Sequence, residues 1–172
     1  MKNKKLVIIS VISVILIGCL SFGLISAYFT DKDTKQNQVT VGYNTIQVVE
    51  DFDSPSELVP GLSFKKDVKV ENTGKVPCYV RVKSLFTDED MLPYCTVDYN
   101  TNDWVYNDKD DYWYYTHKVA INDMTQSLFT TVKINDDVQS SDIKDFDILI
   151  YAESHQSDGY DTYKDVWGEW ND

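Results

Sequence analysis

The histidines and cysteines are the side chains of this chain best suited to catalysis or zinc binding, and they are few. The chain has two histidines, His117 and His155, and no His-Glu-x-x-His pair. A catalytic zinc ion needs three protein ligands. A zinc site in this chain would need both histidines and either Glu153 or Asp158 to lie together in the folded protein. Nothing in the spacing of these residues along the sequence requires that. We therefore expect exposed or capping histidines and no enzyme active site.

Two polar runs hold the oxygen ligands that calcium prefers. The first resembles the opening of an EF-hand loop, but Asp103 stands where glycine belongs and Lys109 where the bidentate acid belongs. Calcium is thus a weak prediction, and no cofactor is expected. The candidate ligands are Asp98, Asn100, Asn102, Asp108 and Asp110.

Cys78 and Cys95 are the two cysteines beyond the N-terminal apolar segment. A disulfide between them would close a loop of about 17 residues and stabilise the fold by roughly 3 kcal/mol in the chain-entropy model. Two separate buried thiols are the alternative. Cys78 alternates with Val80 and Val82, which favours core packing over an activated thiolate.

The charge of the chain narrows the range of partners. The formal net charge is −12. Removal of residues 1–27, which hold three lysines and no acid, would bring it to −15. Nucleic-acid binding needs a basic patch, and none is visible. The charge favours solubility, cations or basic partners.

The N-terminus predicts export. Lys2, Lys4 and Lys5 precede an apolar run from Leu6 to Ile25, and the small residue Ala27 lies before Tyr28, as in a cleaved signal peptide. Because roughly 20 apolar residues also span a bilayer, a retained anchor with cytoplasmic lysines is the alternative. A third interpretation is a lipobox ending at Cys19.

The rest of the chain shows the period of two that is typical of half-buried strands. Turn residues separate these segments. About seven short strands in one domain predict an antiparallel β-sandwich. The expected strands are 39–50 with a bend at Gly42, 64–71, 78–83, 113–115, 128–134 and 146–153.

The connections between these strands are also predicted. The turn residues Asn72–Gly74 favour a hairpin between the strands on either side. Residues 86–111 are expected to be an excursion between sheets. A helical turn capped by Ser140 or Ser141 is expected, as is a short C-terminal helix around Tyr163 and Trp167.

Several local patterns, taken in order, resemble the TasA and camelysin group of exported proteins from Gram-positive bacteria, and most closely the clostridial alternate signal-mediated exported proteins. The matching segments are 27–31, 37–42, 50–52, Pro60-Gly61 with Lys65 or Lys66, 68–74, 79–82, 128–129 and 152–156. They are spread in this order from residue 27 to residue 156.

The resemblance implies a jelly-roll topology and a secreted, cell-surface or biofilm-matrix subunit. It also implies cleavage between Ala27 and Tyr28 by a SipW-type signal peptidase. In such proteins the segment after the signal adds as a strand to a neighbouring subunit, which would make Phe29, Val39 and Val41 part of an assembly strand. A flexible N-terminus is the alternative at that segment.

The expected organisation is therefore a signal peptide or anchor at 1–27, an N-terminal strand or linker at 28–42 and a β-sandwich at 43–172. Expected partners are the signal peptidase and further copies of the chain in fibres. The chain is not expected to bind nucleic acid, and it is expected to contact a membrane only through its N-terminal segment. A camelysin-like surface metalloprotease and a membrane-anchored extracellular binding module are the alternative functions.

Overall fold

The computed structural model describes residues 38–41 and 44–168, which lie in one compact unit, Gln36–Asp172. The helical segments are short: η1 (Glu89–Tyr94), η2 (Ser140–Asp142) and α2 (Tyr163–Trp167). None of the described helices has the length and apolar content needed to cross a bilayer. The strands are β1 (Gln38–Val41), β2 (Asn44–Phe52), β3 (Ser63–Asn72), β4 (Cys78–Phe86), β5 (Cys95–Val97), β6 (Trp104–Asn107), β7 (Tyr112–Tyr115), β8 (Thr131–Ile134) and β9 (Ile148–Gln156).

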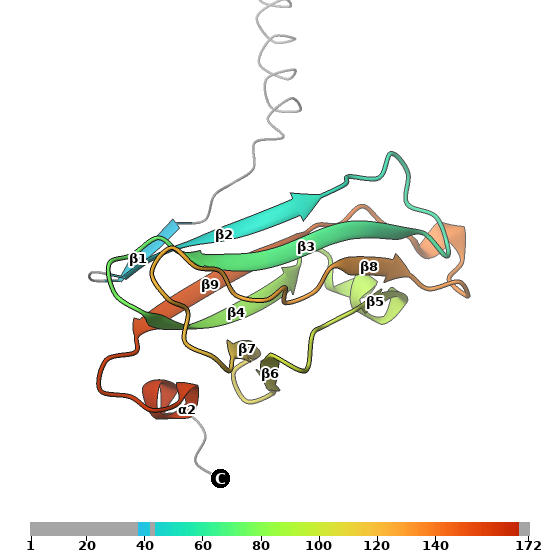
Figure 1. Cartoon of the computed structure of the whole chain (residues 1–172). Helices are drawn as coiled ribbons and strands as arrows, with labels where there is room; N and C mark the ends of the chain where they lie inside the picture. Colours follow the sequence, from blue (N-terminus) through green and yellow to red (C-terminus); the bar gives the residue numbers. More distant parts are fainter. Residues whose placement is uncertain (1–37, 42–43, 169–172) are drawn as a thin grey trace, which may run out of the picture. The chain divides into compact units, whose positions relative to one another are not determined.

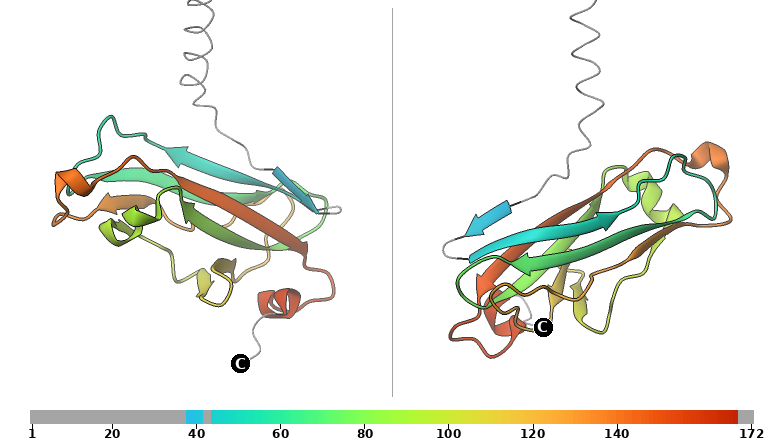
Figure 2. Two further views of the ribbon diagram at one scale, coloured as in Figure 1. Left: turned by 180° about the vertical axis from the view of Figure 1, so that it is seen from behind. Right: turned by 45° about the horizontal axis from the view of Figure 1, so that its top comes forward.

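The strands form two antiparallel sheets (Figures 1 and 2). One has the order β1-β2-β3-β8-β5 and the other β6-β7-β4-β9. The prediction of a mainly β, antiparallel sandwich is confirmed. The expected cleavage at Ala27–Tyr28 and the expected strand at Phe29 lie outside the described residues.

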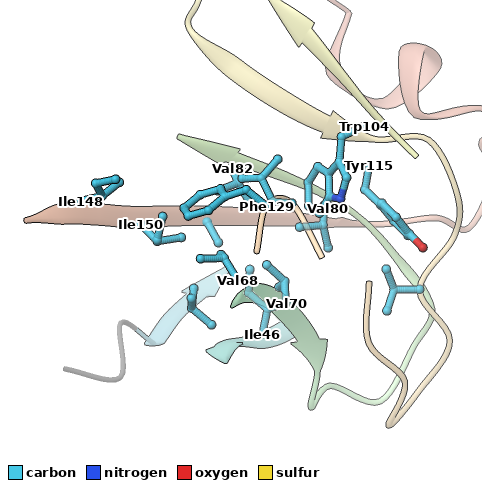
Figure 3. Packing of buried hydrophobic residues seen from close by; sticks show 14 of the residues in the cluster. Ile46, Val68, Val70, Val80, Val82, Trp104, Tyr115, Phe129, Ile148 and Ile150 are labelled. Atoms are coloured by element: carbon cyan, nitrogen blue, oxygen red, sulfur yellow. The ribbon is translucent and has the colours of Figure 1, made fainter. Parts of the chain in front are cut away.

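The core lies between the two sheets, as Figure 3 shows. Alternation along β3 turns Val68 and Val70 inward, and alternation along β9 does the same for Ile148 and Ile150. All four are buried, and each such side chain stabilises the fold by about 1.5–3 kcal/mol relative to exposure. Phe129 and Trp104 fill the space between the sheets.

The predicted hairpin between β3 and β4 is wrong, because these strands belong to different sheets. The chain crosses from one sheet to the other at Asn72, which is fully buried. Its Nδ2 donates to the carbonyls of Val76, at 2.9 Å, and Val119, at 3.1 Å, and its Oδ1 accepts from the N–H of Gly74. The turn chemistry is as predicted, but it builds an arch between layers.

The expected excursion at 86–111 contains two strands that periodicity did not reveal. It leaves β4, forms η1, adds β5 to the edge of the first sheet and returns to form β6 in the second. Of the expected strand 128–134, only β8 is regular, although Leu128 and Phe129 still exchange backbone hydrogen bonds with Val68. The expected bend at Gly42 lies outside the described residues, and the strands before and after it, β1 and β2, pair antiparallel.

The short helices differ in how well they were predicted. The C-terminal helix is confirmed as α2, whose capping box joins Thr162 and Asp165. The predicted cap of the helical turn at η2 is wrong, because its N-cap is Gln139 and no side chain bonds there. In η1 the Asp88 side chain accepts from the N–H of Asp90.

Candidate functional site

The most elaborate polar arrangement in the described residues lies on the outer face of the four-stranded sheet. Three neighbouring strands position it: Arg81 in β4 stands opposite Glu153 in β9 and Tyr114 in β7. The inward neighbours Val80 and Val82 are fully buried, so alternation directs Arg81 to the other face. We call Arg81, Asp110, Tyr112, Tyr114, Glu153 and Trp167 the Arg81 cluster.

The guanidinium of Arg81 is held by acidic and phenolic oxygens. Its Nε and Nη2 lie 2.8 Å and 2.7 Å from Oε2 of Glu153. Its Nη1 donates to the Tyr114 hydroxyl at 3.1 Å and lies 3.5 Å from Asp110 Oδ2. Charge-assisted hydrogen bonds of this kind are stronger than neutral ones, so this ion pair fixes the side chain firmly.

Aromatic rings cover the same guanidinium. Its central carbon lies 4.1 Å from the centroid of Tyr112 and 4.3 Å from that of Trp167. Both distances are within the range of cation–π attraction. Since Trp167 belongs to α2, Arg81 fastens the C-terminal helix to the sheet, and the edge contacts of Tyr114 and His155 with Trp167 add to this.

The protonation states in the Arg81 cluster are set by burial and by these bonds. Burial raises the pKa of Glu153, but the hydrogen bonds from Arg81, Tyr151 and Tyr112 outweigh it, so the pKa lies below its usual value. Burial and hydrogen bonds to carboxylates raise the pKa of the Tyr112 and Tyr114 phenols. A carboxylate and phenols held in these states are poor proton-transfer groups at neutral pH. The cluster is therefore suited to holding α2.

The two histidines contact different residues. The exposed His117 lies 3.3 Å from Asp103. His155 places Nδ1 2.8 Å from the carbonyl of Gln156 and packs edge-on against Tyr160. Within the described residues, no group of three or more histidine, cysteine or acidic side chains is placed to hold a metal ion.

The weak calcium candidates have other hydrogen-bond partners. Asp98 accepts from the backbone N–H groups of Thr130 and Thr131. Asn100 caps its own loop by accepting from the N–H of Asn102. Asp110 bonds the Tyr114 hydroxyl and belongs to the Arg81 cluster. The calcium candidates are thus distributed over two loops with separate structural tasks, and Asp108 is exposed in the second of them.

Of the two cysteine arrangements left open by the sequence, the structure has free thiols. Cys78 begins β4, whereas Cys95 follows η1 beyond the far end of the same strand. Nine strand residues at about 3.3 Å each span far more than the roughly 7 Å that a disulfide allows between Cα atoms. Burial raises the pKa of Cys78 to about 12 and that of Cys95 to about 11.

A second polar cluster was not predicted from the sequence, although Glu50 and Lys66, two of its residues, lie in segments that carry the resemblance. Lys66 in β3 is buried, and its Nζ lies 2.7 Å from Glu50 of β2 and 3.7 Å from Asp147. Phe52 packs over the same ammonium. An inward-facing lysine at an even position of an otherwise apolar strand face is the only sequence signal for it.

The proposed assembly residues Val39 and Val41 lie in β1, which with β5 is one of the two edge strands of the five-stranded sheet. β1 pairs antiparallel with β2 from Gln38 opposite Gln47 to Val41 opposite Asn44. In the described part of the chain it hydrogen-bonds with no other strand.

Compared with known proteins, the chain matches no family model, no curated protein and no solved structure.

Proposed function

We propose that the chain is an exported structural subunit of the cell surface or biofilm matrix of a Gram-positive bacterium, and that its subunits polymerise by exchanging β1. The observation that carries this proposal is the position of β1. It is the first described strand after the predicted export signal and lies at one edge of its sheet. An edge strand near a chain end is the element most readily donated to a neighbouring sheet.

The pairing of β2 supports the proposal. On one side β2 pairs with β1 over four residues, and on the other it pairs with β3 over seven. Ile46 and Val48 of β2 are buried in the core. Departure of β1 therefore leaves β2 anchored by its longer ladder and its core contacts. The edge it vacates is free to accept the β1 of a second copy.

The export part of the proposal rests on the segment Lys2–Ile25 and the junction Ala27–Tyr28. We assign cleavage there to a SipW-type peptidase on the basis of the resemblance. Export also agrees with the strongly acidic charge of the chain. Cys78 and Cys95 lie too far apart in the fold to form a disulfide, so they do not need a reducing compartment to remain thiols.

We further assign the sandwich to the jelly-roll type. Strands distant in sequence pair in both sheets: β3 with β8, β8 with β5, and β4 with β9. Such pairings are typical of Greek-key connections, of which a jelly roll has two. This topology leaves β1 as an addition beside β2, available for exchange.

The test compares purified residues 28–172 with residues 42–172, which lack β1. Electron microscopy and light scattering are expected to show filaments of the first protein and no filaments of the second. Circular dichroism must show a folded, β-rich protein in both. Filaments in neither sample, or in both, would contradict exchange of β1.

A further inference from the structure

Lys66 carries an ammonium group that is buried between the two sheets. It stands in the same inward-facing row of β3 as Val68 and Val70, and its side chain is only 4% exposed. The lysines of four other ion pairs have side chains that are 36–52% exposed; these are Lys65, Lys69, Lys133 and Lys144. Burial of an ammonium costs free energy even when it is paired, so the position of Lys66 points to a task beyond charge pairing.

Two carboxylates, one from each sheet, approach this ammonium. Glu50 of β2, in the sheet that contains Lys66, accepts a hydrogen bond from Nζ at 2.7 Å. Asp147, which directly precedes β9 of the other sheet, places Oδ1 3.7 Å from the same nitrogen. The second distance exceeds that of a hydrogen bond. The nitrogen therefore lies between a carboxylate placed to take its proton and a carboxylate in contact but not bonded to it.

The backbone holds and polarises the carboxyl group of Asp147. Its N–H donates to Oγ1 of Thr87 at 2.8 Å, and its carbonyl accepts from the N–H of Thr87 at 2.9 Å. Oδ1 accepts from the N–H of Ile148 at 2.7 Å. A backbone donor at this oxygen stabilises the negative charge that develops when a nucleophile adds to the neighbouring carbon. Because the side chain is 59% exposed, the other oxygen has a path to solvent.

Phenylalanine rings flank both groups. Phe52 lies over the ammonium of Lys66, with its centroid 4.8 Å from Nζ, and packs edge-on against Phe64. Phe146, the residue before Asp147, stacks on Phe86. Rings in these positions limit the access of water to the nitrogen. Conversion of the ammonium to a neutral amide would remove the cost of burying an ion among them.

We propose that Lys66 and Asp147 condense to an intramolecular amide, an isopeptide bond, with Glu50 as the proton carrier. The lone pair of the deprotonated Nζ attacks Cγ of Asp147, the C–N bond forms, and the bond from Cγ to Oδ2 breaks. Glu50 carries the two protons that the nitrogen loses to the departing oxygen, which leaves as water. The ammonium and the carboxylate become one neutral amide, and no further reactant is needed. The fold supplies a high effective concentration of the two groups, which favours the condensation.

The bond joins the two layers of the sandwich. It links β3 of one sheet to the start of β9 in the other and closes a long loop, which stabilises the fold by restricting the unfolded chain. Cys78 and Cys95 are free, whereas an amide needs no oxidant to form and is not broken by reducing agents. The bond does not involve β1, so it forms whether or not β1 is exchanged between subunits.

Mass spectrometry of the full chain, purified from the cells that make it, tests the bond. The protein is expected to be lighter by one water than the residues it contains. Trypsin is expected to cleave after Lys65 but not after Lys66, and the peptide with Lys66 should remain joined to the peptide with Asp147. A succinimide at Asp158-Gly159 would lose the same water without joining two peptides. That result, or the full mass with cleavage after Lys66, would overturn the proposal.

Matched variants separate the roles of the residues, and circular dichroism verifies each fold. Asp147→Ala is expected to restore the full mass and to lower the unfolding temperature by about 10 °C or more, because the loop is no longer closed. Asp51→Ala, at an equally exposed carboxylate that pairs with Lys65, is expected to keep the bond. Glu50→Gln is expected to slow bond formation at least about a hundredfold, so the freshly purified variant should have the full mass. Loss of water in Asp147→Ala, or a complete bond in fresh Glu50→Gln, would overturn the assigned roles.

Discussion

The side chain of Asn72 donates to the carbonyl of Val119 at 3.1 Å, and this bond joins the last residue of β3 to a segment that pairs with the other sheet. Val119 exchanges backbone hydrogen bonds with Cys78 at the start of β4. One buried amide therefore holds the arch at which the chain changes layers.

Replacement of Asn72 by alanine is expected to lower the free energy of unfolding by about 2–4 kcal/mol, because at a buried site it leaves the carbonyl of Val76 and the N–H of Gly74 without this partner and removes one of the two donors to the carbonyl of Val119. Urea unfolding measures this value. Thr73→Ala is the control, since the Thr73 hydroxyl makes an exposed bond to the carbonyl of Thr45. Equal losses in both variants would contradict the role assigned to Asn72.

Arg81→Met is expected to destabilise the protein by about 2–4 kcal/mol, because it leaves Glu153 partly buried without its cation. It is also expected to release α2, since Trp167 loses the guanidinium beneath it. Hydrogen exchange at Tyr163–Trp167 and urea unfolding measure the two effects. The exposed pair of Lys65 and Asp51 supplies the control: Lys65→Met should leave both readouts as they are. Retained protection of α2 in Arg81→Met would contradict the fastening role.

Stability is expected to fall in acid partly through Glu153. Because its pKa in the folded protein lies below the ordinary value of 4.5, its contribution is fully present above about pH 4.5. The contribution is lost as the pH falls through the lower folded value. The difference in unfolding free energy between the native protein and Glu153→Gln should therefore be large at neutral pH and shrink in acid. A difference that grows on acidification would mean that the pKa is raised.

Both thiols of residues 28–172 are expected to react slowly with a thiol reagent at neutral pH, because burial raises the pKa of each and leaves little thiolate. Cys95 is the less buried and should react first. Cys95→Ser should remove the faster phase, and urea should release both thiols at once. A Cys78–Cys95 disulfide found by non-reducing peptide mapping would contradict the fold.

Sequence patterns predicted the segments with clear alternation and failed where pairing decides the structure. The strands predicted at 78–83 and 146–153 correspond to β4 and β9, in each of which apolar residues recur at every second position over five residues: Cys78, Val80 and Val82, and Ile148, Ile150 and Ala152. Asn72–Gly74 was expected to form a hairpin, but the same turn residues also occur in arches that join two sheets. Only the distant bond to Val119 distinguishes the two. β5 and β6 are three and four residues long, too short for a period to emerge among turn residues.

The candidate site was harder to predict for the same reason. Arg81 and Glu153 are separated by 72 positions, and no local pattern announces that they will stand opposite each other. Two outward charges on two predicted strands were visible, but the strand order that pairs β4 with β9 was not. Trp167 was correctly placed in a C-terminal helix, whereas its contact with Arg81 depends on where that helix lies.

The exchange of β1 is the central claim, and a reversible lock between β1 and β2 tests it most directly. Thr40 of β1 stands opposite Thr45 of β2. Opposed Cα atoms in antiparallel strands are about 4.5–5.5 Å apart, which suits a disulfide. Residues 28–172 carrying Thr40→Cys and Thr45→Cys are compared, oxidised and reduced, with a Thr40→Ser, Thr45→Ser control. Light scattering and electron microscopy should show monomers when oxidised and filaments after reduction, as in the control. Filaments of the oxidised, fully cross-linked protein would contradict the exchange.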